Sequence, residues 1–432
     1  MSRVIDVFGD WVELGGIQRM GSLRADQAHG KEVFSFEYDR EWLASPHVML
    51  LDPALRLFEG PQYLAESNRP NFGLFLDSCP DRWGRLLMKR REAMAARTAG
   101  REQNRLSELD FLLGVHDEQR MGGLRFKAAP GGSPDSSLDG PFLSDEAGKH
   151  VPPWARLREL ENAAWQIQFH EHGKDHEIRE WFNLLMAPGS SLGGARPKAG
   201  VCDEQDELWI AKFPGRNDEF DVGAWEMLAH RLAKKSGIDV ADAKIQKLGR
   251  QHHTFLSKRF DRKTIDNTRS RRHFASAMTM LGYSDGADFH DGASYLQLAE
   301  FLTKQGSDVD ADLKELWRRI VFSICVCNSD DHLRNHGFLL EPGGWKLSPA
   351  YDINPSPDAA GLHLNISEND NSLSLPLALE VAKYFRLDDE SARGEIARII
   401  ESVRTWPIIA MELGISRSEQ ELMRPAFRIA DQ

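Results

Sequence analysis

The sequence predicts an α+β protein made of a β-containing lobe and a following helical lobe, with a small β-rich subdomain in front of them. Over roughly the first 60 residues, short apolar runs alternate with Gly and Asp, as in a unit of short strands. Residues 190–257 read as a Gly-rich turn, a strand, an amphipathic helix and two further strands. From about residue 290 helical periodicity dominates, and one predicted β-hairpin interrupts it. This order of elements predicts a bilobal arrangement.

Length and composition set the broad class. The chain has 432 residues, enough for two or three domains, with 41% hydrophobic residues and a formal net charge of −12. No apolar stretch reaches the roughly 18 residues that cross a bilayer, and the N-terminus does not read as a secretory signal, so we expect a cytoplasmic protein without a membrane partner. The acidic balance argues against an obligate nucleic-acid binder, although basic patches occur at 85–91 and 269–272. The scattered cysteines are expected to pack in the core.

Composition divides the chain into four segments. Residues 1–127 are predicted to form the N-terminal subdomain, with a helix over 80–99 and a second helix that Ser107 caps. Residues 128–153 are rich in Pro, Gly, Ser and Asp, which indicates a linker or long loop. Residues 154–257, which open with a helical stretch to about 185, are predicted to form the first lobe, and 258–432 the helical lobe.

Two features of the first lobe have the chemistry to hold phosphates. The turn SSLGGARPKAG at 190–200 combines glycines, whose backbone N–H groups can approach phosphate oxygens, with the cations Arg196 and Lys198. Lys212 ends the predicted strand 207–211, and Glu226 on the next helix is a candidate ion-pair partner for it. An ordinary hairpin turn and a surface lysine are the competing interpretations.

The segment 258–262, KRFDR, follows the last strand of the first lobe. A hinge at this position would offer backbone groups to an adenine edge, and Phe260 as an apolar wall. The alternating charges by themselves indicate only an exposed strand end.

Residues 328–355, NSDDHLRNHGFLLEPGGWKLSPAYDINP, carry the strongest functional signal. A predicted β-hairpin joins two polar clusters, and a hairpin brings both clusters to one end. Asp330 and Asn335 then face Asp352, as a phosphoryl-transfer enzyme requires to hold magnesium and orient an attacking hydroxyl. Protein kinases have an Asp, an Asn, a short hairpin and a metal-binding Asp in that order. The apolar run 316–327 before this segment is predicted to be a buried helix.

Alternatives remain for these polar residues. Asp, Asn, Gly and Pro are also ordinary turn residues, and the spacing does not separate Asp330 from Asp331 as the base. His332 and His336 are four residues apart, which on a helix is the spacing of zinc ligands and would suggest a metal-dependent hydrolase. The Gly-rich turn, Lys212 and the hinge have no role in a zinc hydrolase, so magnesium and ATP are favoured.

Taken together, these motifs resemble the HipA family of bacterial serine/threonine kinases, the toxin components of type II toxin–antitoxin modules. The resemblance covers nearly the whole chain. The motifs FGDW, PDRWGRLLMKRRE, SELDFLLGV and RMGGLRF resemble the family's additional N-terminal subdomain. The motifs SSLGGARPKAG, FLSKRFDR, SDDHLRNHGF and LSPAYDINP resemble its kinase motifs. The resemblance implies a protein-kinase-like fold with an all-helical C-lobe.

Carried over residue by residue, the resemblance makes Asp330 the catalytic base and Asn335 and Asp352 the magnesium ligands. It also makes Ser191 the site of an inhibitory autophosphorylation, because phosphate there would add negative charge beside the ATP phosphates. The residues implied to bind ATP are Gly193, Gly194, Ala195, Arg196, Pro197, Lys198, Lys212, Lys258, Arg259, Phe260, His332, Leu333, Arg334, Asn335, Tyr351 and Asp352.

The departures from the family pattern indicate another branch. The pair Arg196-Pro197 stands where the best-known members have Gln-Glu, and Asp331 stands where they have Gly. The resemblance implies a protein substrate of the aminoacyl-tRNA synthetase type and a small helix-turn-helix antitoxin of the HipB type, with DNA reached only through the antitoxin complex. The alternative from another class is a catalytically weak kinase fold that acts as co-repressor with a DNA-binding antitoxin.

Overall fold

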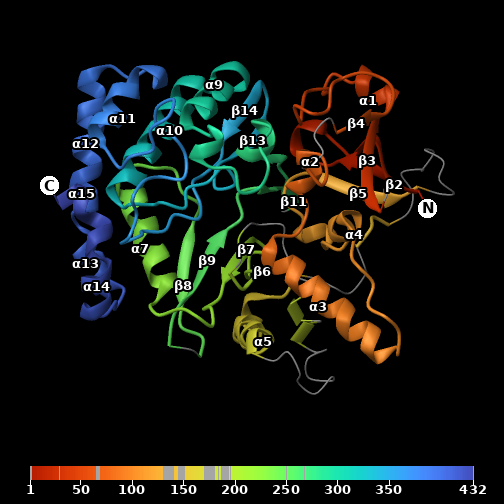
Figure 1. Ribbon diagram of the computed structural model, residues 1–432, viewed down its shortest axis with the longest axis horizontal. Coiled ribbons are helices and arrows are strands. Elements are labelled where there is room, and N and C mark those ends of the chain that lie inside the picture. The colour runs from red at the N-terminus through yellow and green to blue at the C-terminus, as the bar shows by residue number, and fades with distance from the viewer. Residues whose placement is uncertain are drawn as a thin grey trace. The chain divides into compact units, whose positions relative to one another are not determined.

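A computed structural model describes residues 2–28, 30–64, 69–129, 141–144, 151–169, 181–182, 184–185, 194, 196–249, 251–266 and 268–431 (Figure 1). The chain forms two compact units. The first comprises Met1–Arg216 and Asp261–Ala275, and the second comprises Asn217–Phe260 and Ser276–Gln432. One unit boundary falls after Phe260, inside the predicted hinge. The division into four segments stays a prediction.

The first unit is built on a five-stranded antiparallel sheet with strand order β4-β3-β2-β1-β5. Its strands are β1 (Arg3–Gly9), β2 (Gln18–Ala28), β3 (Lys31–Tyr38), β4 (Gln62–Tyr63) and β5 (Leu124–Ala128). Side chains alternate across the pleat, so Val7, Leu23 and Phe36 are buried in the core of this unit. The predicted β-rich start of the chain is therefore confirmed.

Helices and two further strand pairs complete the described part of the first unit. The helices are α1 (Arg40–Ala44), α2 (Gly73–Leu76), α3 (Arg82–Thr98), α4 (Glu108–Leu113) and α5 (Leu157–Phe169). The strand pairs are β6 (Lys198–Cys202) with β7 (Leu208–Lys212), and β10 (Arg262–Ile265) with β11 (Thr268–Arg271).

The two predicted N-terminal helices are confirmed as α3 and α4. The side chain of Ser107 accepts a hydrogen bond from the backbone N–H of Asp110, and the carboxylate of Asp110 accepts one from the backbone N–H of Ser107, which is a capping box. The β10-β11 hairpin was not predicted, because its charged, polar residues lack the apolar alternation of a half-buried strand. In the predicted linker, residues 130–140 and 145–150 lie outside the described residues, whereas Phe142 packs edge-on against Phe8 at 5.6 Å.

The second unit combines short strands with most of the helices. Its strands are β8 (Ala243–Gln246), which pairs with β9 (Thr254–Lys258), and β13 (Gly337–Glu341), which pairs with β14 (Gly344–Leu347). Its helices are α7 (Val222–Lys235), α8 (Ala277–Met280), α9 (Tyr295–Gln305), α10 (Val309–Cys325), α11 (Leu375–Val381), α12 (Asp389–Val403), α13 (Trp406–Glu412), α14 (Arg417–Met423) and α15 (Arg428–Asp431). Strand β12 (Phe274–Ser276) spans a boundary between the units in the chain.

Helix α10 is the centre of the second unit. Its last three turns are almost wholly buried, including Trp317, whose indole N–H donates to the carbonyl of Ala378 at 2.9 Å. Even Arg319 is buried, because it pairs with Glu315 at 3.0 Å and donates to the carbonyl of Ser348 at 2.8 Å. The predicted buried helix is thus confirmed, and it begins earlier than the apolar run that indicated it.

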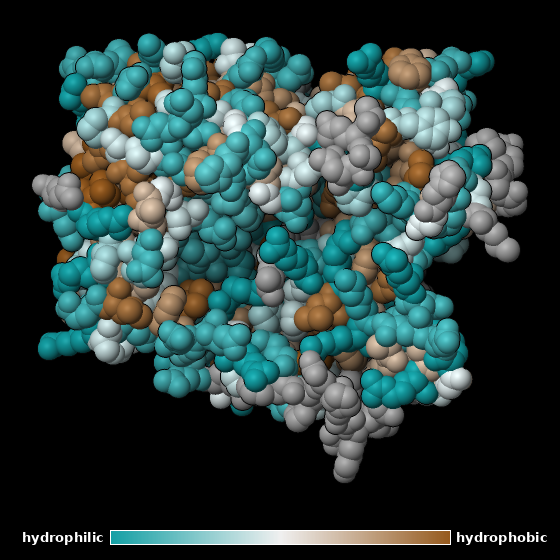
Figure 2. All heavy atoms as spheres, viewed as in Figure 1, coloured by the Kyte–Doolittle hydropathy of each residue, from teal (hydrophilic) through white to brown (hydrophobic). Residues whose placement is uncertain are grey.

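The surface agrees with the acidic, charged composition. In Figure 2, hydrophilic residues cover most of the face that is drawn, and hydrophobic residues form separate patches. Exposed apolar side chains of the second unit include Ile408, Met411 and Leu422 on the C-terminal helices. Within the described part of the chain, no helix combines the length and the hydropathy needed to cross a bilayer.

Stability of the first unit should depend on pH through His273. The ring of this residue is buried and stacks on Trp11 at 4.8 Å, and burial lowers the pKa of His273 to about 3. The unfolded chain takes up this proton near pH 6.5 and the folded chain does not, so stability is highest above pH 6.5 and falls in acid. Between pH 7 and pH 5 we expect a loss of about 2 kcal/mol from His273 alone.

The measurement is the free energy of urea unfolding at both pH values for the wild type and for His273→Phe. Phe keeps an aromatic ring against Trp11 but cannot take up the proton. We expect the variant to lose about 2 kcal/mol less between pH 7 and pH 5 than the wild type. An identical loss in both proteins would show that His273 does not titrate in this way.

Candidate active site

The predicted hairpin of the functional segment is present as β13 and β14. Phe338 pairs with Leu347 and Glu341 with Gly344, so the loop before β13 and the loop after β14 leave from the same end of the hairpin. Buried apolar side chains on both strands fix it in the second unit. The register therefore holds residues 328–336 and 348–355 beside each other.

Asp331 is the buried acid of this region. Its carboxylate accepts hydrogen bonds from the hydroxyl of Tyr295 at 2.6 Å and from that of Ser323 at 3.3 Å, and it lies 3.1 Å from Nε2 of His336. Burial raises the pKa of Asp331, but His336 and the hydroxyl donors outweigh it and hold that pKa below its usual range. Burial and the neighbouring carboxylate raise the pKa of Tyr295 well above its usual value. The Asp331 carboxylate therefore has a structural role, because its buried partners hold it in place.

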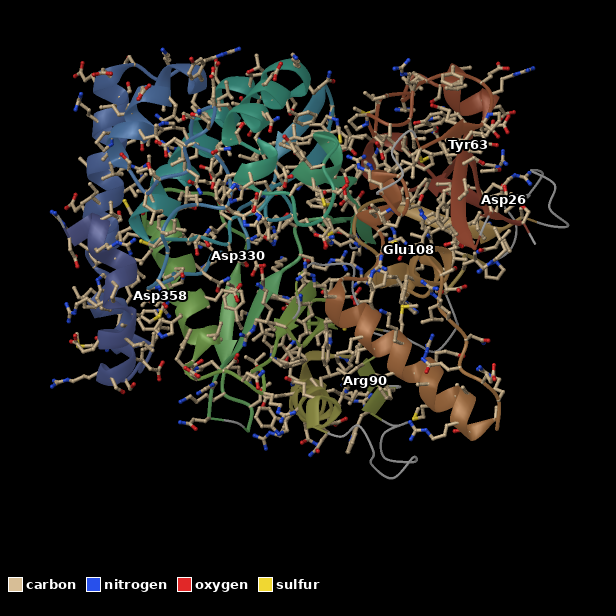
Figure 3. The ribbon with its side chains drawn as sticks, in the orientation of Figure 1. Asp26, Tyr63, Arg90, Glu108, Asp330 and Asp358 are labelled. Atoms are coloured by element: carbon tan, nitrogen blue, oxygen red, sulfur yellow. The ribbon has the colours of Figure 1, made fainter. Side chains whose placement is uncertain are left out.

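Asp330 differs from its neighbour because its side chain is exposed (Figure 3). Among the described residues, its hydrogen bonds are made by the backbone: its carbonyl accepts from the side-chain amide of Asn335 at 2.8 Å and from the backbone N–H of His332 at 2.9 Å. These bonds fix the position of Asp330 and leave its carboxylate accessible. The two acids that spacing could not separate therefore have different environments.

Asp352 follows the hairpin in a strained backbone conformation, with φ of 58°. The left-handed region is uncommon for residues other than glycine, and such residues cluster at functional sites. Its carboxylate accepts from the side chain of Asn354 at 3.3 Å, and the backbone N–H of Asn354 donates to Asn328 at 3.2 Å. A further bond runs from the hydroxyl of Tyr351 to the carbonyl of Arg334 at 2.7 Å. The two loops are tied together by these contacts.

His332 lies near the carboxylates of Asp330, which is exposed, and Asp352, which is half-buried. Burial lowers the pKa of His332, whereas the charges of Asp330 and Asp352 act on the same ring in the opposite direction. The ring also lies 5.7 Å from that of His363. Among the described residues, its buried Nδ1 has no hydrogen-bond partner. Burial therefore favours the neutral form of this imidazole, which lies beside two carboxylates.

Oxygen donors of the kind that Mg²⁺ prefers are present here. The side-chain N–H of Asn335 donates to the carbonyl of Asp330. Within the described part of the chain, no group donates a hydrogen bond to Oδ1 of Asn335. That oxygen and the Asp352 carboxylate are hard ligands of the type that holds magnesium with water and phosphate oxygens. The side chains present thus fit the ion that the resemblance implies.

The predicted adenine-side residues of the second unit follow β9. The rings of Phe260 and Tyr351 lie 5.4 Å apart and are tilted by 36°. Lys258 pairs its backbone N–H with Asp242 at 2.8 Å, and Arg259 is buried. Of the other predicted contacts, Leu333 is buried and Arg334 lies 3.7 Å from Asp285. Phe260 and Tyr351 thereby form an aromatic pair beside the loop that carries Asp352.

The predicted phosphate-binding residues belong to the first unit, and several lie outside the described residues: Ser191, Gly193 and Ala195. Gly194 has φ of 91°, a conformation that suits glycine. The guanidinium of Arg196 donates to the carbonyl of Phe213 at 3.4 Å, and the carbonyl of Pro197 accepts from the N–H of Phe213 at 2.8 Å. These bonds hold the end of the turn beside Lys212, the last residue of β7.

Lys198 lies in β6, where its ammonium forms a buried ion pair with Asp81 at 2.9 Å. Glu226 belongs to the second unit and Lys212 to the first, so their pairing stays a prediction.

The alternative of a zinc pair depends on a helix that contains both histidines. His332 and His336 do not share a helix face, because residues 326–336 between α10 and β13 form turns and irregular backbone. His336 is instead buried against Asp331. Within the described ranges, no three His, Cys, Asp or Glu side chains are placed to hold a metal ion.

Three cations of the two basic patches are paired with carboxylates. The two terminal guanidinium nitrogens of Arg85 donate to Glu108 at 2.7 Å. In the second patch, Arg269 pairs with Glu118 at 2.9 Å and Arg271 with buried Asp117 at 2.9 Å. Cations that are engaged in this way have little charge left to attract a phosphate backbone.

The structure also adds residues that the sequence analysis missed. Tyr295 on α9 and Ser323 on α10 hold Asp331, and Asn328 ties the two loops together. Tyr295 is distant in sequence from the segment it supports, and nothing in its local pattern distinguishes it from an ordinary core tyrosine. Asn328 lies inside the polar segment and could have been included on that ground.

Comparison with known proteins identifies the family. The model of the HipA-like C-terminal domain matches residues 190–406, half of the chain. The chain belongs to the HipA family. A protein of Haemophilus influenzae described as "Putative kinase" is 31% identical over 207 residues, which are 44% of this chain and 58% of that protein. The matched region thus spans less than two thirds of that relative.

The fold is also shared with a solved member of the family. HipA of Shewanella oneidensis MR-1, solved with HipB and operator DNA, matches with a TM-score of 0.63 and 18% identity. The match covers 96% of this chain and 94% of the Shewanella chain. The predicted α+β, kinase-like fold is thereby confirmed.

Proposed function

We propose that this HipA-family protein is a serine/threonine protein kinase that uses ATP and Mg²⁺. The observation that carries the proposal is the contrast within the acidic pair: Asp331 is buried in a hydrogen-bond network, whereas Asp330 presents an exposed carboxylate on a fixed backbone. Family membership and the tied loops of Asn335 and Asp352 support it.

The residues divide the chemistry among them. Asp330 accepts a hydrogen bond from the substrate hydroxyl and takes its proton as that oxygen attacks the γ-phosphorus in line, while the bond from this phosphorus to the bridging oxygen breaks and ADP leaves. The oxygens of Asn335 and Asp352 would hold magnesium, which neutralises phosphate charge when it is bound. The Phe260 and Tyr351 rings would receive the adenine. Gly193 through Pro197 of the Gly-rich turn, together with Lys212, would bind the phosphates, and Ser191 would be the residue that is autophosphorylated.

The partners are proposed from the family. The structurally similar Shewanella HipA was solved with HipB and operator DNA. We propose a small helix-turn-helix antitoxin of the HipB type for this chain, and a protein substrate of the aminoacyl-tRNA synthetase type. DNA would be reached through the antitoxin, in keeping with the engaged cations of both basic patches.

Intact-mass spectrometry of phosphatase-treated protein tests the proposal. After incubation with Mg-ATP, we expect a gain of one phosphoryl group that maps to Ser191, and no gain when EDTA is present. A protein that gains no phosphate and also transfers none to a mixture of aminoacyl-tRNA synthetases would contradict kinase activity. The co-repressor alternative would then account for the fold.

Replacement of Asp352 by Asn should weaken the use of magnesium. Asn also tolerates a positive φ, so the substitution adds no backbone strain at this position. It removes the negative charge of one proposed magnesium ligand. We expect the Mg²⁺ concentration for half-maximal autophosphorylation to rise at least about tenfold and the maximal rate to fall roughly a hundredfold. A magnesium titration of the initial rate measures both. An unchanged titration curve would remove Asp352 from the metal site.

A further inference from the structure

Asp81 occupies a position in the first unit to which the proposed function gives no role. It is the N-cap of α3, and its Oδ1 accepts from the backbone N–H of Gly84 at 2.7 Å. Its other oxygen, Oδ2, lies 2.9 Å from the ammonium of Lys198 at the start of β6. The same carboxylate therefore begins a helix of the N-terminal subdomain and holds the end of the Gly-rich turn (Figure 3 labels Arg90 on this helix).

The ion pair is fully enclosed. The side chains of Lys198 and Asp81 are only 3% and 1% exposed. A buried ion pair gains little net stability over an apolar pair, but removal of one partner is strongly unfavourable. Its effect is to specify where the start of α3 and the start of β6 lie relative to each other, because separation of the pair would leave a buried charge without this partner. A fixed position of β6 follows.

Two further contacts strengthen the same junction. The indole N–H of Trp83, in the first turn of α3, donates to the carbonyl of Lys198 at 3.1 Å. Farther along β6, the side chain of Gln119 packs directly on Gly200, where an added Cβ would lie 2.0 Å from it. Side chains of the N-terminal subdomain thus hold both the side chain and the backbone at the start of β6.

The junction reaches the turn itself. A Cβ added at Gly194 would lie 3.0 Å from the Lys198 ammonium, so that ammonium lies close to the turn's backbone. Lys198 is therefore in contact distance of the proposed phosphate-binding segment on one side and bound to Asp81 on the other. The charge of Lys198 is balanced by the Asp81 carboxylate, whereas a lysine that binds phosphate directly would pair its charge with the phosphate.

We propose that Asp81 is a positioning residue for ATP binding, and that Lys198 anchors the Gly-rich turn to α3 rather than serving as a phosphate ligand. The proposal rests on the proposed kinase function. It gives the N-terminal subdomain a role in nucleotide affinity, because the start of α3 holds Lys198, the residue at which the turn enters β6. Displacement of a binding segment by a fraction of an ångström to an ångström weakens binding and catalysis.

The test compares Asp81→Asn, Lys198→Met and the double variant in the full-length protein. We measure the Kd for a fluorescent ATP analogue, and the KM for ATP and kcat of autophosphorylation. For an anchor, each single variant raises Kd and KM roughly tenfold, kcat stays within about twofold, and the double variant is no worse than either single one. If Lys198 instead contacts phosphate directly, Asp81→Asn leaves Kd unchanged or lower, which would overturn the proposal.

Asp39→Asn is the matched control. Asp39 is also an N-cap, of α1, and also binds a cation, Arg19, but it belongs to another part of the subdomain. We expect its Kd for the analogue to equal that of the wild type. A weakening equal to that of Asp81→Asn would mean that any damage to the subdomain acts on ATP, and would contradict a specific anchor.

Circular dichroism checks that each variant folds. If the unpaired ammonium of Asp81→Asn prevents folding, Asp81→Glu replaces it: the charge pair is kept, but the extra methylene must displace Lys198 in a fully buried site. An unchanged Kd in that variant contradicts the anchor. Failure of the proposed function looks different, because the wild type would then bind no analogue and transfer no phosphate.

Discussion

Replacement of Asp330 by Asn is expected to lower the rate of phosphoryl transfer by about 10²–10⁴-fold while the protein stays folded and binds ATP. The carboxylate of Asp330 is exposed. The hydrogen bond from Asn335 goes to the backbone carbonyl of Asp330, which the substitution leaves in place. Asn keeps the shape of the side chain and cannot take the proton. Intact mass after incubation with Mg-ATP measures transfer, and binding of a fluorescent ATP analogue measures affinity.

Asp358→Asn is the control for this experiment. Asp358 is an exposed aspartate of the same unit, in a loop without a proposed catalytic role (Figure 3). We expect it to phosphorylate itself at the wild-type rate. Autophosphorylation that persists in Asp330→Asn at a comparable rate would disprove the assignment of the base.

Replacement of Asp331 by Ala is expected to lower the free energy of unfolding by about 3 kcal/mol or more. The substitution leaves the buried hydroxyl of Tyr295 without its acceptor and removes the carboxylate 3.1 Å from the ring of His336. Urea unfolding followed by tryptophan fluorescence measures the change. We expect activity to fall as well, because Asp330 directly precedes Asp331 in the loop that this network holds.

The double variant Asp331→Ala with Tyr295→Phe separates the hydroxyl from the rest of the network. Removal of both partners of a buried hydrogen bond is less costly than removal of one. We expect Tyr295→Phe to restore part of the stability lost in Asp331→Ala. If Asp331→Ala unfolds at the wild-type urea concentration, the buried network is not what supports the catalytic loop.

The opposite outcomes for Asp330 and Asp331 show what a sequence alone could not provide. Both residues are aspartates in one polar loop, and local pattern gives no reason to prefer either. The structure separates them because the hydroxyls of Tyr295 and Ser323 both donate to Asp331. Tyr295 belongs to α9, which is distant in the chain from this loop, and Ser323 belongs to α10, the helix that precedes the loop. Periodicity and residue spacing do not reveal which hydrogen-bond partners come from other elements of the fold.

Local chemistry did determine much of the fold. Ser107 begins α4, the apolar run at 316–327 is the buried part of α10, and the turn at 341–344 closes the β13-β14 hairpin. Each of these depends on neighbours a few residues away: a side chain that caps a free N–H, a helical stripe, a Gly-Gly turn. The order of motifs was also sufficient to indicate the family, which the match over 190–406 confirmed.

Only the tertiary structure decided the roles of charged residues. Lys198 reads in the sequence as a cation of a phosphate-binding turn, but its ammonium is buried against Asp81, more than a hundred residues earlier. Arg85 and Arg271 read as basic patches, but carboxylates of other segments neutralise them. His332 and His336 read as a zinc pair, but the backbone between them is not helical. The physical reason is common to all three: secondary structure follows from short-range interactions, whereas the charge that a side chain presents depends on which distant groups the fold places beside it.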